Sequence, residues 1–283
     1  MRSSMLKNLL LVGLLTACCT GFALSKGELL AKGIRCYKNK NFTEAVKWFR
    51  QAAEQGDAKA QYNLGWCYAR GEGVEPDDFE AAKWYRKAAE QGHSKAQYNL
   101  GMCYFKGEGV PKDGEKVAYW FRKAAVQGHV KAQIKLGLCY EDGIGVYKDL
   151  RKASYWYRQA AEKGDADAQF FFGVCCEKGT GVTRDMAKAV HWYFKAAEQG
   201  QPQAQFFLAC TYASGDGVTM DIDLAMKWLH KSAENGCVSA QYILGLRYAR
   251  GEGVPRDPDK AAFWLRQAAS QGHEKAKAAL RNL

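Results

Sequence analysis

A period of 36 residues runs through this 283-residue chain and constrains its fold more than any other feature. The hexad Ala-Gln-Tyr-Asn-Leu-Gly, which begins at Ala60, recurs with variation every 36 residues up to Ala276. A glycine column and a tryptophan column keep the same step, and seven of the eight tryptophans lie on the second of these. A unit of this length buries its apolar face only against its neighbours, so the period predicts a repeat protein whose extended surface is suited to binding.

Each repeat has the pattern of two helices joined by a glycine turn. Ala60, Leu64 and Tyr68 form an apolar stripe along the first helix. Gly71 and Gly73 follow, and glycine ends a helix readily because it adopts positive φ without a steric clash. The pattern predicts one helix pair in every 36 residues.

An aspartate stands just before each predicted second helix. The column consists of Asp77, Asp113, Asp149, Asp185, Asp221 and Asp257. A carboxylate at this position can accept the unpaired amide hydrogens of the first turn, which stabilises a helix by about 1 kcal/mol. We therefore expect these six residues to cap helices and not to serve as catalytic acids.

These columns together resemble the Sel-one-like repeat (SLR) family of tetratricopeptide-like proteins. The pattern A-x-Y-x-L-G-x-x-Y-x-x-G-x-G-V-x-x-D-x-x-K-A-x-x-W-Y-x-K-A-A-x-x-G can be read from Ala60 to Gly92, with Glu80 where lysine is usual. The resemblance covers residues 27–283 and implies an all-α, right-handed α-solenoid. About seven helix-turn-helix repeats would be closed by a C-terminal capping helix from Ala276 to Leu283.

The first repeat is shorter than the others. Gly33 and Ala45 are twelve residues apart, whereas the equivalent Gly65 and Ala81 are sixteen apart. We expect a short turn without the glycine pair, and Asn41 as the N-cap of the second helix.

The N-terminus has the pattern of an export signal. Basic residues in 1–8 precede the apolar run 9–15, which is too short to span a bilayer as a mature helix. Residues 1–25 are expected to form the signal, with cleavage after Ala23 or Ser25. Alternatively, Leu15-Thr-Ala-Cys18 resembles a bacterial lipobox, so that residues 1–17 are removed and Cys18 carries lipid. Both alternatives predict export to the periplasm, the outer membrane or the medium, with membrane contact only through such an anchor.

The chain is basic, with a formal net charge of +11. Part of this charge forms a column on the second helices, made of Arg50, Arg86, Arg122, Arg158 and Arg266. We expect a solvated outer face, and a site for an acidic partner is the alternative. Nucleic acid is not an expected partner because the chain has an export signal and no nucleic-acid-binding motif.

Four cysteines follow the repeat, namely Cys67, Cys103, Cys139 and Cys175. One repeat step is about 10 Å, the distance between packed helices, and a disulfide needs Cα atoms within about 7 Å. We expect these four to be small core residues. Cys36, Cys176, Cys210 and Cys237 lie off this column and remain candidates for pairing in some combination.

The sequence offers little chemistry. His93, His129 and His273 share one turn position, where we expect solvent exposure, and whole repeats separate them too widely to share a zinc ion. No metal or other cofactor is expected. The resemblance implies one enzymatic alternative, since some cysteine-rich SLR proteins are linked to penicillin binding or β-lactam hydrolysis. The single S-x-x-K motif, Ser4 to Lys7, lies in the expected signal, so we predict no enzyme activity.

Binding is therefore expected along the first helices, which line the concave face in related solenoids. The predicted site comprises Tyr62, Trp66, Arg70, Tyr98, Met102, Phe105, Lys106, Asp142, Lys178 and Arg250. Its basic members favour an acidic or C-terminal-carboxylate-bearing protein or peptide segment, and its aromatic members are typical interface anchors. Alternatively, the apolar members pack between neighbouring helices.

We thus predict an exported adaptor that scaffolds an envelope assembly or engages a host protein. The alternative is a β-lactam-binding or weakly β-lactam-hydrolysing cell-wall-related enzyme. A purely structural spacer is a third class, and it would have no ligand on the first helices.

Overall fold

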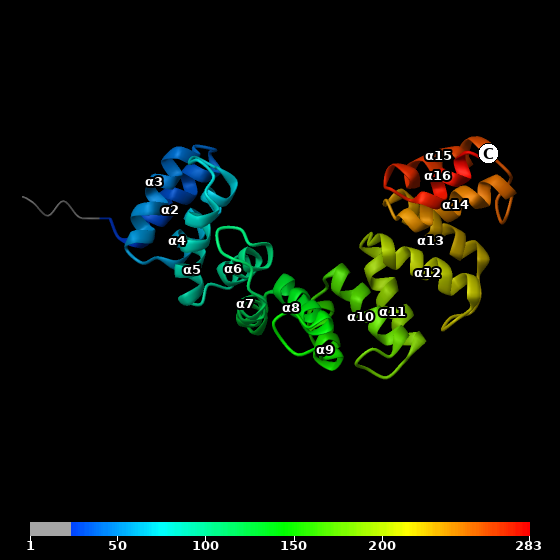
Figure 1. Ribbon diagram of the computed structural model, residues 1–283, viewed down its shortest axis with the longest axis horizontal. Coiled ribbons are helices and arrows are strands. Elements are labelled where there is room, and N and C mark those ends of the chain that lie inside the picture. The colour runs from blue at the N-terminus through cyan, green and yellow to red at the C-terminus, as the bar shows by residue number, and fades with distance from the viewer. Residues whose placement is uncertain (1–23) are drawn as a thin grey trace, which may run out of the picture. The chain divides into compact units, whose positions relative to one another are not determined.

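The computed structural model describes residues 24–283, and within these residues all regular structure is helical (Figure 1). The expected signal and Cys18 lie outside the described residues. The helices form seven consecutive pairs and a closing helix, which confirms the predicted solenoid. In chain order they are α2 Lys26–Lys38, α3 Phe42–Glu54, α4 Ala58–Arg70, α5 Asp78–Glu90, α6 Ser94–Lys106, α7 Gly114–Val126, α8 Val130–Asp142, α9 Leu150–Ala161, α10 Ala166–Lys178, α11 Met186–Glu198, α12 Pro202–Ser214, α13 Ile222–Glu234, α14 Val238–Arg250, α15 Pro258–Ser270 and α16 Glu274–Leu280.

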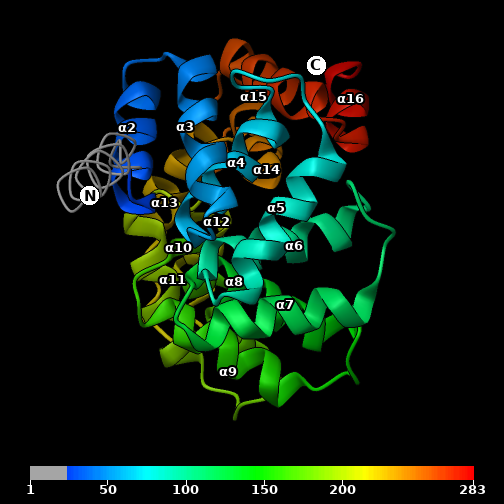
Figure 2. The same ribbon diagram turned by 90° about the vertical axis from the view of Figure 1, so that its left-hand side faces the viewer.

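The described chain divides into two compact units. Unit 1 ends at Lys112 and contains α2 to α6, and unit 2 begins at Asp113 and contains α7 to α16. In unit 1, α2, α3 and α4 lie side by side (Figure 2), and Leu29, Phe49 and Leu64 are buried among them. In unit 2, α16 packs on α15, where Leu265 and Ala276 are buried.

The aspartate column caps the second helices as predicted. Asp77 Oδ1 accepts the amide hydrogen of Glu80 at 2.9 Å. The five equivalent aspartates make the same contact, at 2.8 to 3.0 Å. Asn41 caps α3 in the same way, so the short turn of the first repeat is confirmed as well.

The glycine turn joins the two helices of one repeat and packs against the repeat before it. Gly71 ends α4 in the left-handed conformation, with φ of 67°. Gly109, two residues after the end-glycine of α6, packs so closely on the start of α5 that an added Cβ would lie 1.9 Å from the carbonyl oxygen of Asp78. All these turns need glycine for the backbone angle, and those with Gly73, Gly109, Gly145 and Gly181 also need it for this close approach.

A buried glutamine near the start of every first helix after α2 bonds to the helix before it. Gln61 Nε2 donates to the main-chain oxygen of Ala53 at 3.1 Å, near the C-terminus of α3. Five further glutamines do the same, namely Gln97, Gln133, Gln169, Gln205 and Gln241. Each of these glutamines thus donates to a main-chain oxygen at the C-terminus of the preceding second helix. Without it, that oxygen would lack an intrahelical partner and would depend on solvent.

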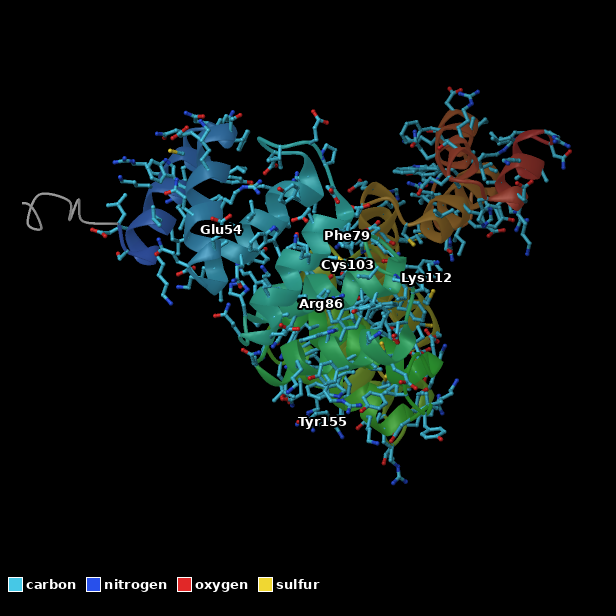
Figure 3. The ribbon with its side chains drawn as sticks, turned by 60° about the vertical axis from the view of Figure 1, so that its left-hand side comes forward. Glu54, Phe79, Arg86, Cys103, Lys112 and Tyr155 are labelled. Carbon is cyan, nitrogen blue, oxygen red and sulfur yellow. The ribbon has the colours of Figure 1, made fainter. Side chains whose placement is uncertain are left out.

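The arginine column is exposed, as expected, and three of its members also make hydrogen bonds that join one repeat to the next. Arg86 on α5 (labelled in Figure 3) donates to the hydroxyl of Tyr104 on α6 at 3.0 Å. Arg50 and Arg122 make the equivalent bonds to Tyr68 and Tyr140. Where Cys176 replaces the tyrosine, Arg158 instead bonds Glu162 at 2.7 Å.

The expectation of solvent-exposed histidines was wrong. His93, His129 and His273 are half-buried N-caps of first helices, and His93 Nδ1 accepts the amide hydrogen of Ala96 at 3.2 Å. The same position holds Asp57 and Asp165 in other repeats, where the carboxylate accepts the equivalent hydrogen. A neutral imidazole can replace the carboxylate because its unprotonated nitrogen is also an acceptor.

All eight cysteines among residues 24–283 have free thiols. The column of Cys67, Cys103, Cys139 and Cys175 is buried, as predicted. Burial raises the pKa of Cys67, Cys103 and Cys175 to about 12 and that of Cys139 to about 11. These thiols stay protonated at neutral pH and react slowly with oxidants.

Candidate functional site

An apolar pocket of about 420 Å³ opens between the first helices of unit 1. Its lining consists of Ile34, Tyr37 and Lys38 from α2, Phe49 from α3, and Tyr62, Asn63 and Trp66 from α4. Phe49 is buried against Gly33, so it forms the base of the pocket, and Ile34 is 37% exposed. A volume of this size accommodates one or two large side chains.

A chain of polar contacts fixes the ring of Trp66. Its Nε1 donates to the hydroxyl of Tyr37 at 3.2 Å, and that hydroxyl donates to Glu72. Arg70 donates to the other oxygen of Glu72 at 3.0 Å, and its guanidinium lies 5.0 Å from the centre of the Trp66 ring. The aromatic wall is therefore ordered without a ligand, which lowers the entropy that binding would cost.

Tyr62 lies one turn before Trp66 on α4 and extends the same aromatic wall. Its ring lies 4.8 Å from that of His93 and 6.0 Å from that of Tyr85, centre to centre. Burial raises the pKa of Tyr62, and burial together with the bond to Glu72 raises that of Tyr37. Both phenols therefore stay neutral at physiological pH and serve as amphipathic walls, each with one polar tip.

The structure brings two of the predicted residues into this pocket. Tyr62 and Trp66 line it, and Arg70 covers one face of Trp66. Tyr98 and Met102 are half-buried on α6, and Phe105 is 46% exposed on the same helix. The remaining predicted residues are exposed at the ends of their helices, Lys106 in unit 1 and Asp142, Lys178 and Arg250 in unit 2.

Three of the predicted cations already have acidic neighbours. Besides the Arg70 contact, Lys106 pairs with Glu108 at 3.2 Å and Arg250 with Glu252 at 3.5 Å. Both pairs are exposed, and such pairs contribute little to stability. They do reduce the positive potential that the basic residues alone would give, so an acidic partner gains less here than the sequence suggests.

Sequence reasoning missed Ile34, Tyr37, Lys38, Asn63 and Glu72. Aligning Gly33 with Gly65 places Ile34 at the position of Trp66 and Lys38 at that of Arg70. The shorter first turn shifts the register by four residues, and this shift concealed the correspondence. The contact of Tyr37 with Glu72 joins two repeats and has no signal in the 36-residue pattern.

The pocket contains groups for binding more than for chemistry. Its lining offers aromatic rings, one amide and one ammonium group, and no serine, threonine or cysteine. Across residues 24–283, no cluster of three histidine, cysteine or acidic side chains has the geometry of a metal site. Within the same residues, none of the helices combines the length and apolar character needed to span a membrane.

The fold is that of a helical-repeat protein. The Sel1 repeat family matches the chain seven times, over residues 22–57, 58–93, 94–129, 130–165, 166–201, 202–237 and 238–273. The chain therefore belongs to the Sel1 repeat family. Proteins of this family are typically non-enzymatic scaffolds for protein interactions.

Two solved structures are similar over most of the chain. One is c5321, a protective antigen of uropathogenic Escherichia coli with an SLR fold, which has a TM-score of 0.82 and 38% identity. The match covers 92% of this chain and 56% of that one. A Sel1 repeat protein from Oxalobacter formigenes has a TM-score of 0.79 and 40% identity, with 85% of this chain and 96% of that chain covered.

Curated relatives match over shorter stretches. HcpC of Helicobacter pylori, provisionally named a beta-lactamase, is 36% identical over 72 residues, or 24% of this chain. The matched stretch spans 25% of HcpC. A match over so short a stretch shows a shared repeat and does not extend to the activity of the whole relative.

Proposed function

We propose that this protein is an exported adaptor that holds a segment of a protein partner on the first helices of unit 1. The pocket lined by Tyr37, Tyr62 and Trp66 carries this proposal, because it is apolar, open and ordered in advance. A large aliphatic or aromatic side chain of the partner would fill the pocket. Such buried aromatic contacts account for much of the affinity of protein interfaces.

Charge at the pocket rim suggests the neighbouring residue of the partner. Lys38 lines the pocket, whereas Arg70 is already engaged by Glu72. An aspartate or glutamate next to the apolar anchor would therefore meet Lys38. The sequence alone favoured an acidic or C-terminal-carboxylate-bearing segment, and the pocket narrows this proposal to a short motif of one acidic and one bulky apolar residue.

The test is binding to an array of synthetic peptides that carry a bulky apolar residue beside aspartate, asparagine or lysine. We expect the aspartate series to bind best, and Ile34→Glu to weaken binding by about tenfold or more because it places a charge in the pocket wall. Val126→Glu on α7, where the side chain is 71% exposed, is the matched control and should bind normally. Equal binding by these two variants would rule out the pocket.

A second variant tests the acidic preference separately. Lys38→Glu should reverse the order of the aspartate and lysine series while leaving the preference for a bulky apolar residue unchanged. If the order of the two series does not change, Lys38 does not set it.

A β-lactam-directed enzyme is the alternative, favoured by the partial match to HcpC. The pocket contains no nucleophile of the kind that acyl transfer needs, so we propose binding instead. Saturable hydrolysis of a chromogenic cephalosporin by the purified protein would overturn this choice.

Export is part of the proposal and rests on the sequence of residues 1–25. The start of α2 favours one cleavage position over another. Ser25 caps α2 together with Glu28, and Leu24 packs against the core of unit 1. Cleavage after Ala23 would keep this cap, whereas cleavage after Ser25 would remove it. Mass spectrometry of the mature N-terminus separates these two from a lipid-modified Cys18.

A further inference from the structure

Three consecutive second helices of unit 2 carry an excess of positive charge. Within their bounds, α7, α9 and α11 contain eight basic and two acidic residues. By contrast, α3, α5 and α13 each contain equal numbers of basic and acidic residues. On α15 two basic residues stand against one acidic residue, as on α11, so the excess is greatest on α7 and α9 and is not general to second helices.

The same three helices expose aromatic rings at one shared position. Tyr119 is 50% exposed and Tyr155 is 53% exposed, and His191 follows 36 residues later. Tyr155 lies at the margin of the ribbon in Figure 3. In α3, α5 and α13 this position is a lysine. In α15 it is Phe263, which is 51% exposed but has Asp259 and Gln267 four residues away, so a ring with a cation four residues away is confined to α7, α9 and α11 among the second helices.

Each ring is held against the tryptophan that follows it. Tyr119 and Trp120 meet edge to face with their centres 4.9 Å apart, and Tyr155 and Trp156 do so at 5.1 Å. His191 and Trp192 adopt the same arrangement at 5.6 Å. Each of the three rings is thus held in contact with a tryptophan and remains partly exposed to solvent.

Basic side chains lie one helical turn from these rings, on the same side of each helix. Lys123 follows Tyr119 by four residues, Arg151 precedes Tyr155 by four and Lys195 follows His191 by four. None of these three cations takes part in an ion pair within the described residues, whereas Lys116, Lys152 and Lys188 pair with the N-cap aspartates. We call the set Tyr119, Lys123, Arg151, Tyr155, His191 and Lys195 the basic aromatic face.

We propose that the basic aromatic face docks on an anionic phospholipid surface. Tyrosine and tryptophan rings settle at the headgroup level, with an apolar body and a polar tip. Lysine and arginine add attraction to anionic headgroups. An aromatic ring with a cation four residues away recurs on each of the three helices. This repetition fits a partner that presents the same chemistry everywhere, as a bilayer does. The site shares no residue with the pocket of unit 1.

Flotation with vesicles tests the proposal on the full chain. Vesicles of equal parts phosphatidylglycerol and phosphatidylcholine should bind the protein more tightly than vesicles of phosphatidylcholine alone. Reversing three charges at once, with Lys123→Glu, Arg151→Glu and Lys195→Glu, should lower binding to the anionic vesicles by roughly a hundredfold.

The matched control reverses three cations on other second helices, with Lys87→Glu, Lys227→Glu and Lys231→Glu. It changes the net charge equally and should lower binding much less. Both variants keep the same N-terminal residues, so any contribution of residues 1–23 to membrane binding cancels. Thermal unfolding by circular dichroism confirms that both are folded.

A further variant tests the rings. Tyr119→Ser with Tyr155→Ser should weaken binding by roughly tenfold without changing its dependence on salt, because the rings contribute apolar and not ionic attraction. Equal losses in the two charge variants, or no preference for phosphatidylglycerol, would overturn the proposal. Neither result would bear on peptide binding by unit 1.

Discussion

The side-chain oxygen of Gln133 is buried without a hydrogen-bond partner within the described residues, because Lys163 donates to the carbonyl oxygen of Gly128 instead. In other repeats a glutamine or asparagine thirty residues later donates to this oxygen, as Gln91 does to Gln61 at 2.7 Å. The row of amide bonds that joins successive repeats is therefore incomplete at one point in unit 2.

Restoring this bond should stabilise the protein. Lys163→Gln supplies the missing donor to a buried acceptor, and we expect a gain of about 1 kcal/mol, less the lost contact to Gly128. Lys163→Ala loses the same contact and supplies no donor, so it should be no more stable than the parent. Urea unfolding of all three proteins makes the comparison, and equal midpoints for the two variants would contradict it.

Cys237 is the N-cap residue of α14 and makes no side-chain capping bond. Asp57 and Asp165 occupy this position in other repeats and accept an amide hydrogen at 2.8 and 3.0 Å. Cys237→Asp should therefore raise the stability of the protein by about 1 kcal/mol. Cys237→Ala is the control for loss of the thiol. If the melting temperature of Cys237→Ala equals or exceeds that of Cys237→Asp, a capping bond at this position does not stabilise the protein.

Acid should weaken the cap that His93 provides. Burial lowers the pKa of His93, and Lys95 and Lys59 lower it further. The unfolded chain takes up the proton first, at about pH 6.5, so the stabilisation is complete above that pH and is lost as the pH falls through the lower folded pKa.

His93→Asp replaces the imidazole with the carboxylate that other repeats use. The variant should therefore lose less stability than the parent when the pH falls from about 7.5 to about 5. Denaturation midpoints at the two pH values provide the measurement. A parent and variant that lose the same stability would show that His93 does not titrate in this window.

A glycine in each of α2, α4, α8 and α10 makes room for a ring on the second helix of its repeat. A Cβ added at Gly65 would lie 2.9 Å from Cδ1 of Tyr85. Gly65→Ala should therefore cost about 1 to 3 kcal/mol through overpacking. At the equivalent positions of a later repeat, Ala209 is accompanied by Leu229.

Tyr85→Leu should accordingly make Gly65→Ala less costly. A double-mutant cycle measured by urea unfolding gives the coupling between the two positions. If the losses of unfolding free energy in the two single variants simply add in the double variant, the two positions are not coupled. Leu229 would then not compensate for Ala209.

The repeat pattern predicted the helices, the aspartate caps and the buried cysteine column, because each depends on spacing within one repeat. Contacts that join repeats were harder to foresee. The bond from Arg86 to Tyr104 and the contact of Tyr37 with Glu72 depend on how one helix pair lies on the next. His93 was misjudged because histidine is a less common cap, although Asp57 at the same position indicates the role.

The bond from each buried glutamine to the preceding helix has a consequence for how such a chain can change in length. Every contact of this kind joins a repeat only to the one directly before it, as from Gln61 to Ala53 or from Gln241 to Ala233. A block of 36 residues can therefore be duplicated or deleted with its ends at any phase of the period, and each remaining glutamine still meets a carbonyl of the helix before it. Copy number, and with it the span of the binding surface, can vary between related proteins without redesign of the core.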